Sequence, residues 1–312
     1  MKENLINIRV WGDFACFTRP EMKVERVSYP LMTPSAARGI LEAIFWKPEM
    51  FYLIDAIRVV KKGVWTSFRR NEVSKAINFR DAPRWMRGEK EVQIIKSDDT
   101  GSDIEPKRSS TRTQRNMLAL RDVEYIVSAE IRVSEIGRRG GNPILKYTEE
   151  AKRRIKSGKC FHRPALGVRE FSTDFDLVEN PDEELERRIN ENVSDYAKAN
   201  KLTEAEVREK HSDKNGLGKF TDKDLGLMLY DVFAPSTRAA GFRFVHDEDF
   251  TDAETPLLSS PVKKPKANKN QILTDGVLVN PSASFFLGEI KDSVMDCHPE
   301  RVSIIHKNGG AN

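Results

Sequence analysis

The 312-residue chain lacks paired cysteines, long apolar runs and an apolar leader. Its three cysteines, Cys16, Cys160 and Cys297, are odd in number and widely spaced, so we expect reduced thiols in a cytoplasmic protein. No run of about 18 apolar residues is present, which argues against a membrane-spanning helix. The opening MKENLINIRV has no apolar signal core, so nothing points to secretion.

Clustered metal ligands are also missing from the sequence. Cys160 with His162, and Cys297 with His298, are pairs without a second pair at the spacing typical of a zinc site. We therefore expect no metal and no other cofactor.

Charge is plentiful and unevenly distributed, although the formal net charge is only +4. Ten basic residues fall between positions 138 and 169, opposed only by Glu149 and Glu150: Arg138, Arg139, Lys146, Lys152, Arg153, Arg154, Lys156, Lys159, Arg163 and Arg169. Such a dense basic segment, mixed with glycine, indicates a polyanion site, although a solvated face has the same composition. Residues 170–195 are acidic, and form either a solvated helix or a guard against indiscriminate polyanion binding.

The first 60 residues predict a strand, a helix and a second strand. Residues 6–10 alternate apolar and polar side chains, and residues 51–60 are mostly apolar. Between them, Thr33 and Pro34 can start a helix over residues 35–45. This helix ends unusually, because Phe45, Trp46 and Lys47 stand together just before a proline.

A second strand–helix–strand unit follows long polar loops that we expect over residues 63–120, with at most one hairpin. Its parts are a strand at 122–133, a glycine-rich loop at 137–143, a helix at 148–157 and a strand at 171–177. Two such units predict an α+β fold with a ferredoxin-like sheet of the RNA-recognition-motif type. In that fold the helices cover one face, and the other face is open to nucleic acid.

The remaining residues complete the predicted domain organisation. Residues 1–178 form the ferredoxin-like domain, and residues 179–224 form a charged, helical insertion. Residues 225–290 form a smaller C-terminal β-sheet region with strands at 225–234 and 276–281, and a basic, proline-containing surface loop at 259–271. Residues 291–312 are expected to be a flexible tail.

Several segments together resemble one family. Residues 10–48, VWGDFACFTRPEMKVERVSYPLMTPSAARGILEAIFWKP, closely resemble the opening of the Cas-five family of CRISPR-associated proteins, in the subtype of type I-C systems; FRRNEVS, LRDVEYIVSAEI, RPALGVREF and LGLMLYDV follow in the family's order. The resemblance implies an antiviral-defence nuclease. It would cut the repeat hairpin of precursor CRISPR RNA without metal, remain on the 5′ handle in the Cascade complex beside the backbone and large subunits, and meet target DNA through that complex.

Metal-free RNA cleavage uses the 2′-hydroxyl of the substrate as nucleophile and leaves a 2′,3′-cyclic phosphate. The protein supplies a base, an acid and a cation against the growing phosphorane charge. The resemblance implies catalytic positions at Phe45, Lys146 and Tyr147, where the family has Tyr or His, Lys and His. Phe45 cannot move a proton, so it either stacks on a base or packs in the core. Tyr147 is a poor base, because an ordinary tyrosine has a pKa near 10.

Lys146 could still stabilise the transition state, and His162 is a candidate substitute base. The positions expected to bind RNA are Arg19, Lys23, Arg26, Arg38, Trp46, Lys47, Arg69, Arg70, Arg138, Arg139 and Arg153. Two main functional hypotheses stay open: an endoribonuclease that matures CRISPR RNA, and a non-catalytic subunit that only caps the 5′ handle. An unrelated RNA-binding module is a third.

Overall fold

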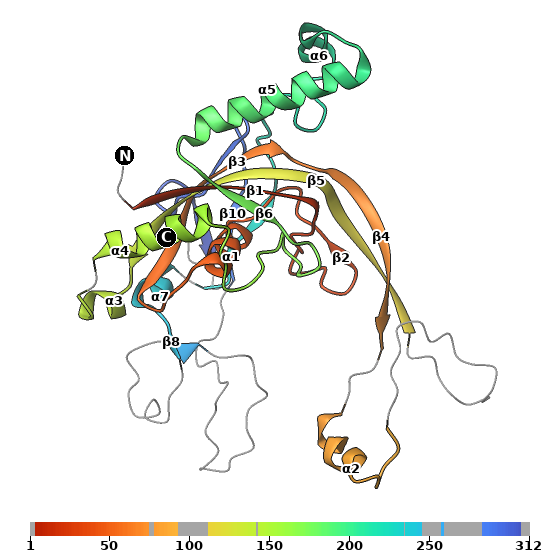
Figure 1. Cartoon of the computed structure of the whole chain (residues 1–312), viewed down its shortest axis with the longest axis vertical. Coiled ribbons are helices and arrows are strands. Elements are labelled where there is room, and N and C mark those ends of the chain that lie inside the picture. Colours follow the sequence, from red (N-terminus) through yellow and green to blue (C-terminus); the bar gives the residue numbers. More distant parts are fainter. Residues whose placement is uncertain are drawn as a thin grey trace, which may run out of the picture.

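The computed structural model describes residues 4–74, 78–92, 112–141, 143–233, 235–244, 257–258 and 283–306. The protein is a mixed α/β fold built around one curled sheet of seven strands (Figure 1). The order along this sheet is β11-β3-β5-β1-β6, and β2 and β4 also pair with β5. The predicted loop at 259–271 and the predicted strand at 276–281 lie outside the described residues.

The centre of the sheet consists of two strand–helix–strand units. The first contains β1 (Leu5–Ala15), α1 (Pro34–Ile44) and β3 (Met50–Lys61), and the second contains β5 (Arg112–Val133), α4 (Ile144–Lys156) and β6 (Asp174–Val178). The short β2 (Arg26–Val27) runs parallel to β5. β5 lies between β3 and β1, and β6 lies on the far side of β1, with every one of these pairs antiparallel.

The main core lies between the sheet and the two helices α1 and α4. Alternate residues of β1 and β5, such as Ile8 and Tyr125, point to this side and are fully buried. They meet the apolar stripe of α1, including Ile40 and Ile44, as expected for an amphipathic helix. Thr33 caps α1 by accepting a hydrogen bond from the backbone N–H of Ala36.

The opposite face of the sheet is not open, contrary to the expectation from the sequence. Helix α5 (Pro181–Asn200), with α6 (Glu204–Lys210), lies across it (Figure 1). Ile126 of β5 packs there against Leu185 and Val193 of α5. Glu124, which faces the same side, accepts a 2.6 Å hydrogen bond from Arg188 of α5. The sheet face expected to bind nucleic acid is therefore largely occupied by the protein's own helix.

The stretch expected as long loops contains a two-stranded arm. β4 (Val64–Val73) pairs with the first half of β5 through ten residues, and this arm projects from the body (Figure 1). Two positions turn the strands at its base, Gly63 with φ +89° and Asp122 with φ 57°. A side chain at position 63 would collide with Val123 at 2.7 Å, so glycine is required there. A 3-10 turn (Phe79–Asp81) and α2 (Ala82–Met86) are also described in this stretch.

The basic segment is more helical than its glycines predict. Ser134 caps the short α3 (Glu135–Arg139), where a loop was expected. α4 starts at Ile144, after Pro143, instead of at Thr148. Thr148 is buried inside the helix, and its hydroxyl donates to the backbone carbonyl of Ile144. The predicted helix start at Thr148 is therefore wrong, because a threonine can also lie inside a helix when its hydroxyl bonds to a backbone carbonyl of the preceding turn.

The C-terminal residues form a second, three-stranded sheet and return to the first. β12 (Ile304–His306), β10 (Ser284–Leu287) and β7 (Leu227–Asp231) form the small sheet, while β11 (Val294–Asp296) pairs with β3. α7 (Pro235–Ala240) follows β7, and β8 (Arg243–Phe244) pairs with β9 (Leu257–Leu258). The prediction of a flexible tail from residue 291 is wrong for the residues up to 306. Met295 and Cys297 are fully buried there.

A buried ionic cluster joins α1 to the small sheet and to α7. Arg38 of α1 lies 3.1 Å from the Asp231 carboxylate, which also accepts a 2.5 Å hydrogen bond from Arg238. Glu42 of α1 binds both arginines. Arg38 was expected on the polar side of its helix as an RNA contact; it is instead a buried structural residue. In the described part of the chain, no helix has the length and apolar character needed to cross a membrane.

Candidate nucleic-acid interface

A groove of about 790 Å³ runs beside the outer side of α1. One wall is the small-residue side of the helix, with Ser35, Ala36, Gly39 and Ala43, because helical spacing places these four residues on one side. The other walls come from the segment after α4 (His162, Arg163, Ala165, Gly167 and Arg169), from residues that follow β1 and β2 (Phe17, Thr18 and Tyr29), from the α1 cap Thr33, and from Leu229 of β7.

The loop after α4 is fixed against the end of β1, so its side chains are held at the groove. The backbone N–H of Cys16 donates to the Leu166 carbonyl at 2.9 Å. Gly167 has φ +91°, and a Cβ there would lie 2.0 Å from the Cys16 carbonyl oxygen. The backbone N–H groups of Phe161 and His162 both donate to the Ala43 carbonyl of α1 at 3.0 Å. This anchoring holds His162 at the end of α1.

The basic segment is largely exposed, and two of its arginines, Arg163 and Arg169, line the groove. Eight of its ten basic residues are exposed, and two are partly buried, Lys152 and Arg154. The exposed ones are Arg138, Arg139, Lys146, Arg153, Lys156, Lys159, Arg163 and Arg169. The neighbouring acidic stretch pairs with part of the basic surface, as Asp174 does with Arg163 at 3.1 Å. An exposed cationic surface beside a groove suits a phosphate backbone.

The aromatic end of α1 is closed toward solvent. Phe45 is 0% exposed, so its ring packs in the core and offers no face to a base. Its ring is parallel to that of Phe161, with centroids 6.5 Å apart. Lys47 Nζ and the Arg154 guanidinium lie 5.9 and 5.7 Å from the Phe45 centroid. Of the two interpretations of Phe45, burial favours packing.

Tyr147 and Lys146 are neighbours in sequence but occupy different environments. Lys146 is exposed on α4, whereas Tyr147 is 2% exposed and belongs to the main core. A phenol in the core cannot reach a 2′-hydroxyl of bound RNA without unfolding part of α4. The structure therefore argues against Tyr147 as the base and leaves Lys146 at the surface.

We expect Tyr147→Phe to leave the rate of RNA cleavage within about threefold of the parent, because the lost hydroxyl is buried away from the groove. The free energy of unfolding should fall by at most about 1 kcal/mol, the usual net contribution of a hydrogen bond. Single-turnover cleavage and urea denaturation measure the two effects. A cleavage loss of a hundredfold with normal RNA affinity would restore Tyr147 to the catalytic residues.

The positions predicted to bind RNA fall into several structural classes. Lys23, Arg69, Arg138, Arg139 and Arg153 are exposed. Trp46 and Lys47 are partly buried. Arg26 and Arg70 both pair with Glu170, at 3.5 and 2.5 Å, and Arg19 lies over the ring of Tyr29 at 4.9 Å. The hydrogen bond from Arg70 holds the pKa of Glu170 below its usual value, so this carboxylate remains charged beside the two arginines.

Two residues at the interface were missed by the sequence analysis, Phe161 and Tyr29. Phe161 is 55% exposed although it is a large aromatic, and Arg154 lies 4.2 Å over its ring. Tyr29 lines the groove, and burial raises the pKa of its phenol, so it stays protonated and acts as a donor. The sequence signal for Phe161 is the run CFHRP, in which an aromatic stands between a cysteine and a histidine.

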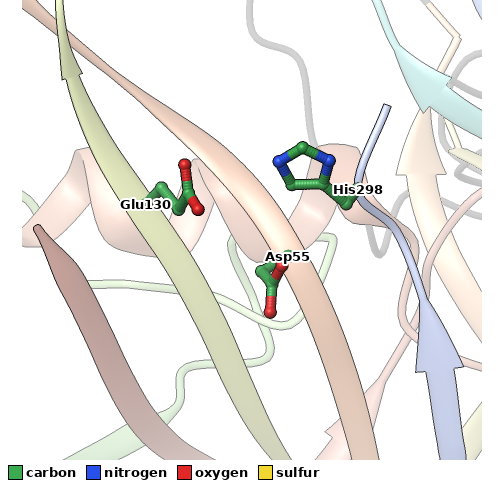
Figure 2. A group of neighbouring side chains, drawn as sticks. All are labelled: Asp55, Glu130 and His298. Carbon is green, nitrogen blue, oxygen red and sulfur yellow. The ribbon is translucent and has the colours of Figure 1, made fainter. Parts of the chain in front are cut away.

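Asp55, Glu130 and His298 bring three possible metal ligands within 4.8 Å of one another, the one such group in the described parts of the chain (Figure 2). Each already has a partner. Arg132 donates to Glu130 at 3.0 Å, Arg301 donates to Asp55 at 2.8 Å, and the backbone N–H of Glu300 donates to His298 Nδ1 at 3.3 Å. The two cations neutralise the carboxylates, so this group functions as an ionic junction between β3, β5 and the C-terminal segment.

Comparison with known proteins places the chain in a family. The family model Cas_Cas5d, described as CRISPR-associated protein (Cas_Cas5), matches residues 5–262. The chain belongs to the Cas5d family of CRISPR-associated proteins. This agrees with the resemblance found in the sequence motifs.

Two curated relatives carry the name "CRISPR pre-crRNA endoribonuclease Cas5d". The one from Mannheimia succiniciproducens is 36% identical over 230 residues, which cover 73% of this chain and 85% of that protein. The one from Thermus thermophilus is 41% identical over 170 residues, covering 54% and 62% of the two chains.

Solved structures are less similar. "Crystal Structure of CRISPR-associated Protein" matches with a TM-score of 0.47 and 17% identity, over 94% of this chain and 90% of that one. "CRISPR RNA-guided surveillance complex" matches with a TM-score of 0.32 and 17% identity, over 55% and 60%.

Proposed function

We propose that this Cas5d-family chain is a metal-independent endoribonuclease that cuts CRISPR repeat RNA to the mature guide. The observation that carries the proposal is the family match, with relatives named as pre-crRNA endoribonucleases over 85% of the length of one of them. The groove beside α1, bordered by an exposed basic surface, supports it because it presents cations and hydrogen-bond donors to RNA.

The proposed reaction is attack of a substrate 2′-hydroxyl on the adjacent phosphate. The oxygen loses its proton to a base, the P–O5′ bond breaks, and the 5′-oxygen takes up a proton. The products are a 2′,3′-cyclic phosphate and a 5′-hydroxyl. Lys146 would face the phosphorane charge, since it is an exposed cation on α4. His162 would remove or return the proton, because its imidazole is exposed at the groove and none of the described residues hydrogen-bonds to its ring.

We expect His162→Ala to slow cleavage by about 10²–10⁴-fold, the usual contribution of general acid–base catalysis, while RNA affinity changes little. Single-turnover rates across pH 5–9 measure the effect, because loss of the base also removes its limb of the pH profile. Arg208→Ala, on α6 across the sheet, is a surface control. Unchanged cleavage in His162→Ala would remove this residue from the catalytic set.

The wider proposals follow from the same family. The two strand–helix–strand units, with strand order β3-β5-β1-β6, support a ferredoxin-like, RNA-recognition-motif domain over residues 1–178. The insertion at 179–224 and the β region at 225–290 would complete it. The protein would act in the cytoplasm, stay on the 5′ handle of the guide and assemble with the backbone and large subunits of Cascade, which contact target DNA.

Burial of Phe45 and Tyr147 favours one alternative, a non-catalytic subunit that only binds the 5′ handle. The deciding experiment is incubation of the purified chain with a labelled repeat hairpin in EDTA. One cut that leaves a cyclic phosphate supports the endoribonuclease. Tight binding of intact RNA supports the handle-binding subunit, and absence of binding would contradict both.

A further inference from the structure

We propose that Phe161 and the small-residue side of α1 form a subsite for an unpaired RNA nucleotide, with the Phe161 ring as the stacking platform for its base. This inference rests on the proposed function and names a positioning residue that the sequence motifs did not indicate. Three observations carry it: the exposure of Phe161, the charge around it, and the space left over Gly39.

The exposure of Phe161 is not explained by the stability of the fold. Because the Phe161 ring is 55% exposed, it contributes little hydrophobic stabilisation to the fold. Its position is nevertheless fixed by its neighbours. Phe45 lies parallel to it, Arg154 lies 4.2 Å over it, and its backbone N–H donates to Ala43. Arg154 covers one face of the ring, and the exposed part that remains is of the kind on which bases of single-stranded RNA stack.

Gly39 supports the same subsite from the helix side. It lies mid-way along α1, where glycine is less favourable than alanine, and a Cβ added there would meet nothing within 4 Å. Packing within the protein therefore does not require glycine at this position. The residue faces the groove, so its missing side chain leaves room for a ligand that lies against the helix.

Phe161 does not itself line the groove, but its neighbour His162 and its hydrogen-bond partner Ala43 do, so the groove begins beside the ring and has the size and chemistry for a nucleotide. Its volume of about 790 Å³ lies within the usual range of ligand pockets, about 300–1,000 Å³. Thr18 and Ser35 offer hydroxyls to a ribose or base edge, and Arg163 and Arg169 offer charge to phosphates. A base that stacks on an aromatic side chain must first leave its own stack, so the occupant is a single-stranded nucleotide flanking or interrupting the hairpin.

The test uses the full chain and repeat RNA in which 2-aminopurine replaces one unpaired nucleotide at a time. Stacking quenches this base, so the parent protein should quench one position strongly. We expect Phe161→Ala to abolish that quenching and raise Kd about tenfold, which equals about 1.4 kcal/mol. Phe161→Trp should restore both, whereas Phe161→Leu, which keeps apolar surface but no ring face, should not. Gly39→Met, which keeps the helix but fills the groove, should also raise Kd.

Leu287→Ala is the control, because Leu287 is 69% exposed and lies on the small sheet. It should leave quenching and Kd unchanged, and thermal melting should show all variants folded. Equal quenching and affinity in the parent, Phe161→Ala and Phe161→Leu would overturn the subsite while leaving the proposed function intact. Failure of the parent protein to bind the repeat at all would instead overturn the proposed function.

Discussion

Asp231→Ala is expected to lower the free energy of unfolding by about 3–5 kcal/mol, because it leaves buried arginines without their counter-charge. Asp231 is 6% exposed, and it binds Arg38 and Arg238, which are 8% and 6% exposed. After the substitution, Glu42 is the one acidic side chain among the described residues that still pairs with the two guanidinium groups. A loss of this size is a large fraction of the 5–15 kcal/mol that usually stabilises a domain.

Urea denaturation followed by circular dichroism measures this loss, with Asp195→Ala as the matched control. Asp195 pairs with Lys198 at 3.9 Å, and its side chain is 80% exposed, so its removal should change stability by less than about 0.5 kcal/mol. If Asp231→Ala were as stable as Asp195→Ala, the cluster would not hold α1 to β7. Because α1 forms a wall of the groove, RNA affinity should fall together with stability.

The Asp231 cluster also predicts how stability depends on pH. Burial would raise the pKa of Asp231, but Arg38 and Arg238 outweigh it, so the pKa lies below its usual value. A lowered pKa stabilises the fold above the pKa of the unfolded chain, about 3.9, and the contribution is lost as pH falls through the folded pKa. The difference in stability between the parent and Asp231→Asn should therefore be constant at neutral pH and should shrink below about pH 4.

The sequence predicted the centre of the fold because local pattern and tertiary contact agree there. The alternation in β1 and the apolar stripe of α1 appear in the structure as two faces of one core. Prediction from the sequence failed for the elements whose structure depends on contacts between residues far apart in the chain. In β4, partly buried residues alternate with exposed ones, but the partly buried residues Thr66, Phe68, Arg70 and Glu72 are mostly polar, so no apolar–polar alternation marks this strand in the sequence. The C-terminal segment has little pattern, yet β11 is ordered by pairing with β3.

The candidate site, too, was predicted from the sequence only in part. Sequence motifs located the basic segment and the end of α1, but spacing along a helix decides which neighbours are exposed. Lys146 and Tyr147 are adjacent in the chain, yet Lys146 is exposed and Tyr147 is buried, because neighbours in a helix point in different directions. Arg38 is charged and was placed at the surface, although partners almost 200 residues away bury it. Pairing across such distances is not visible in a single sequence, so charge alone overestimates the RNA contacts.

Lys146→Ala is expected to slow cleavage of repeat RNA by about 10²–10³-fold, the usual effect of removing one donor that faces transition-state charge. RNA affinity should change by less than about threefold, because many other exposed cations contact the polyanion. The rate should fall more than the affinity because the phosphorane carries more negative charge than the ground-state phosphate. A correctly placed ammonium therefore binds the transition state more strongly than the substrate. Single-turnover rates at saturating protein, with Kd from anisotropy, separate the two quantities.

Two variants make the Lys146 result specific. Lys146→Arg keeps the charge and should retain more cleavage than Lys146→Ala, although the wider guanidinium will not restore the full rate. Lys198→Ala removes an equally exposed lysine from α5, across the sheet, and should change neither quantity. Equal losses of cleavage and affinity in Lys146→Ala would assign Lys146 to RNA binding alone. Tight binding of uncut RNA by the parent and by Lys146→Ala would show that the chain caps the 5′ handle and that another nuclease makes the cut.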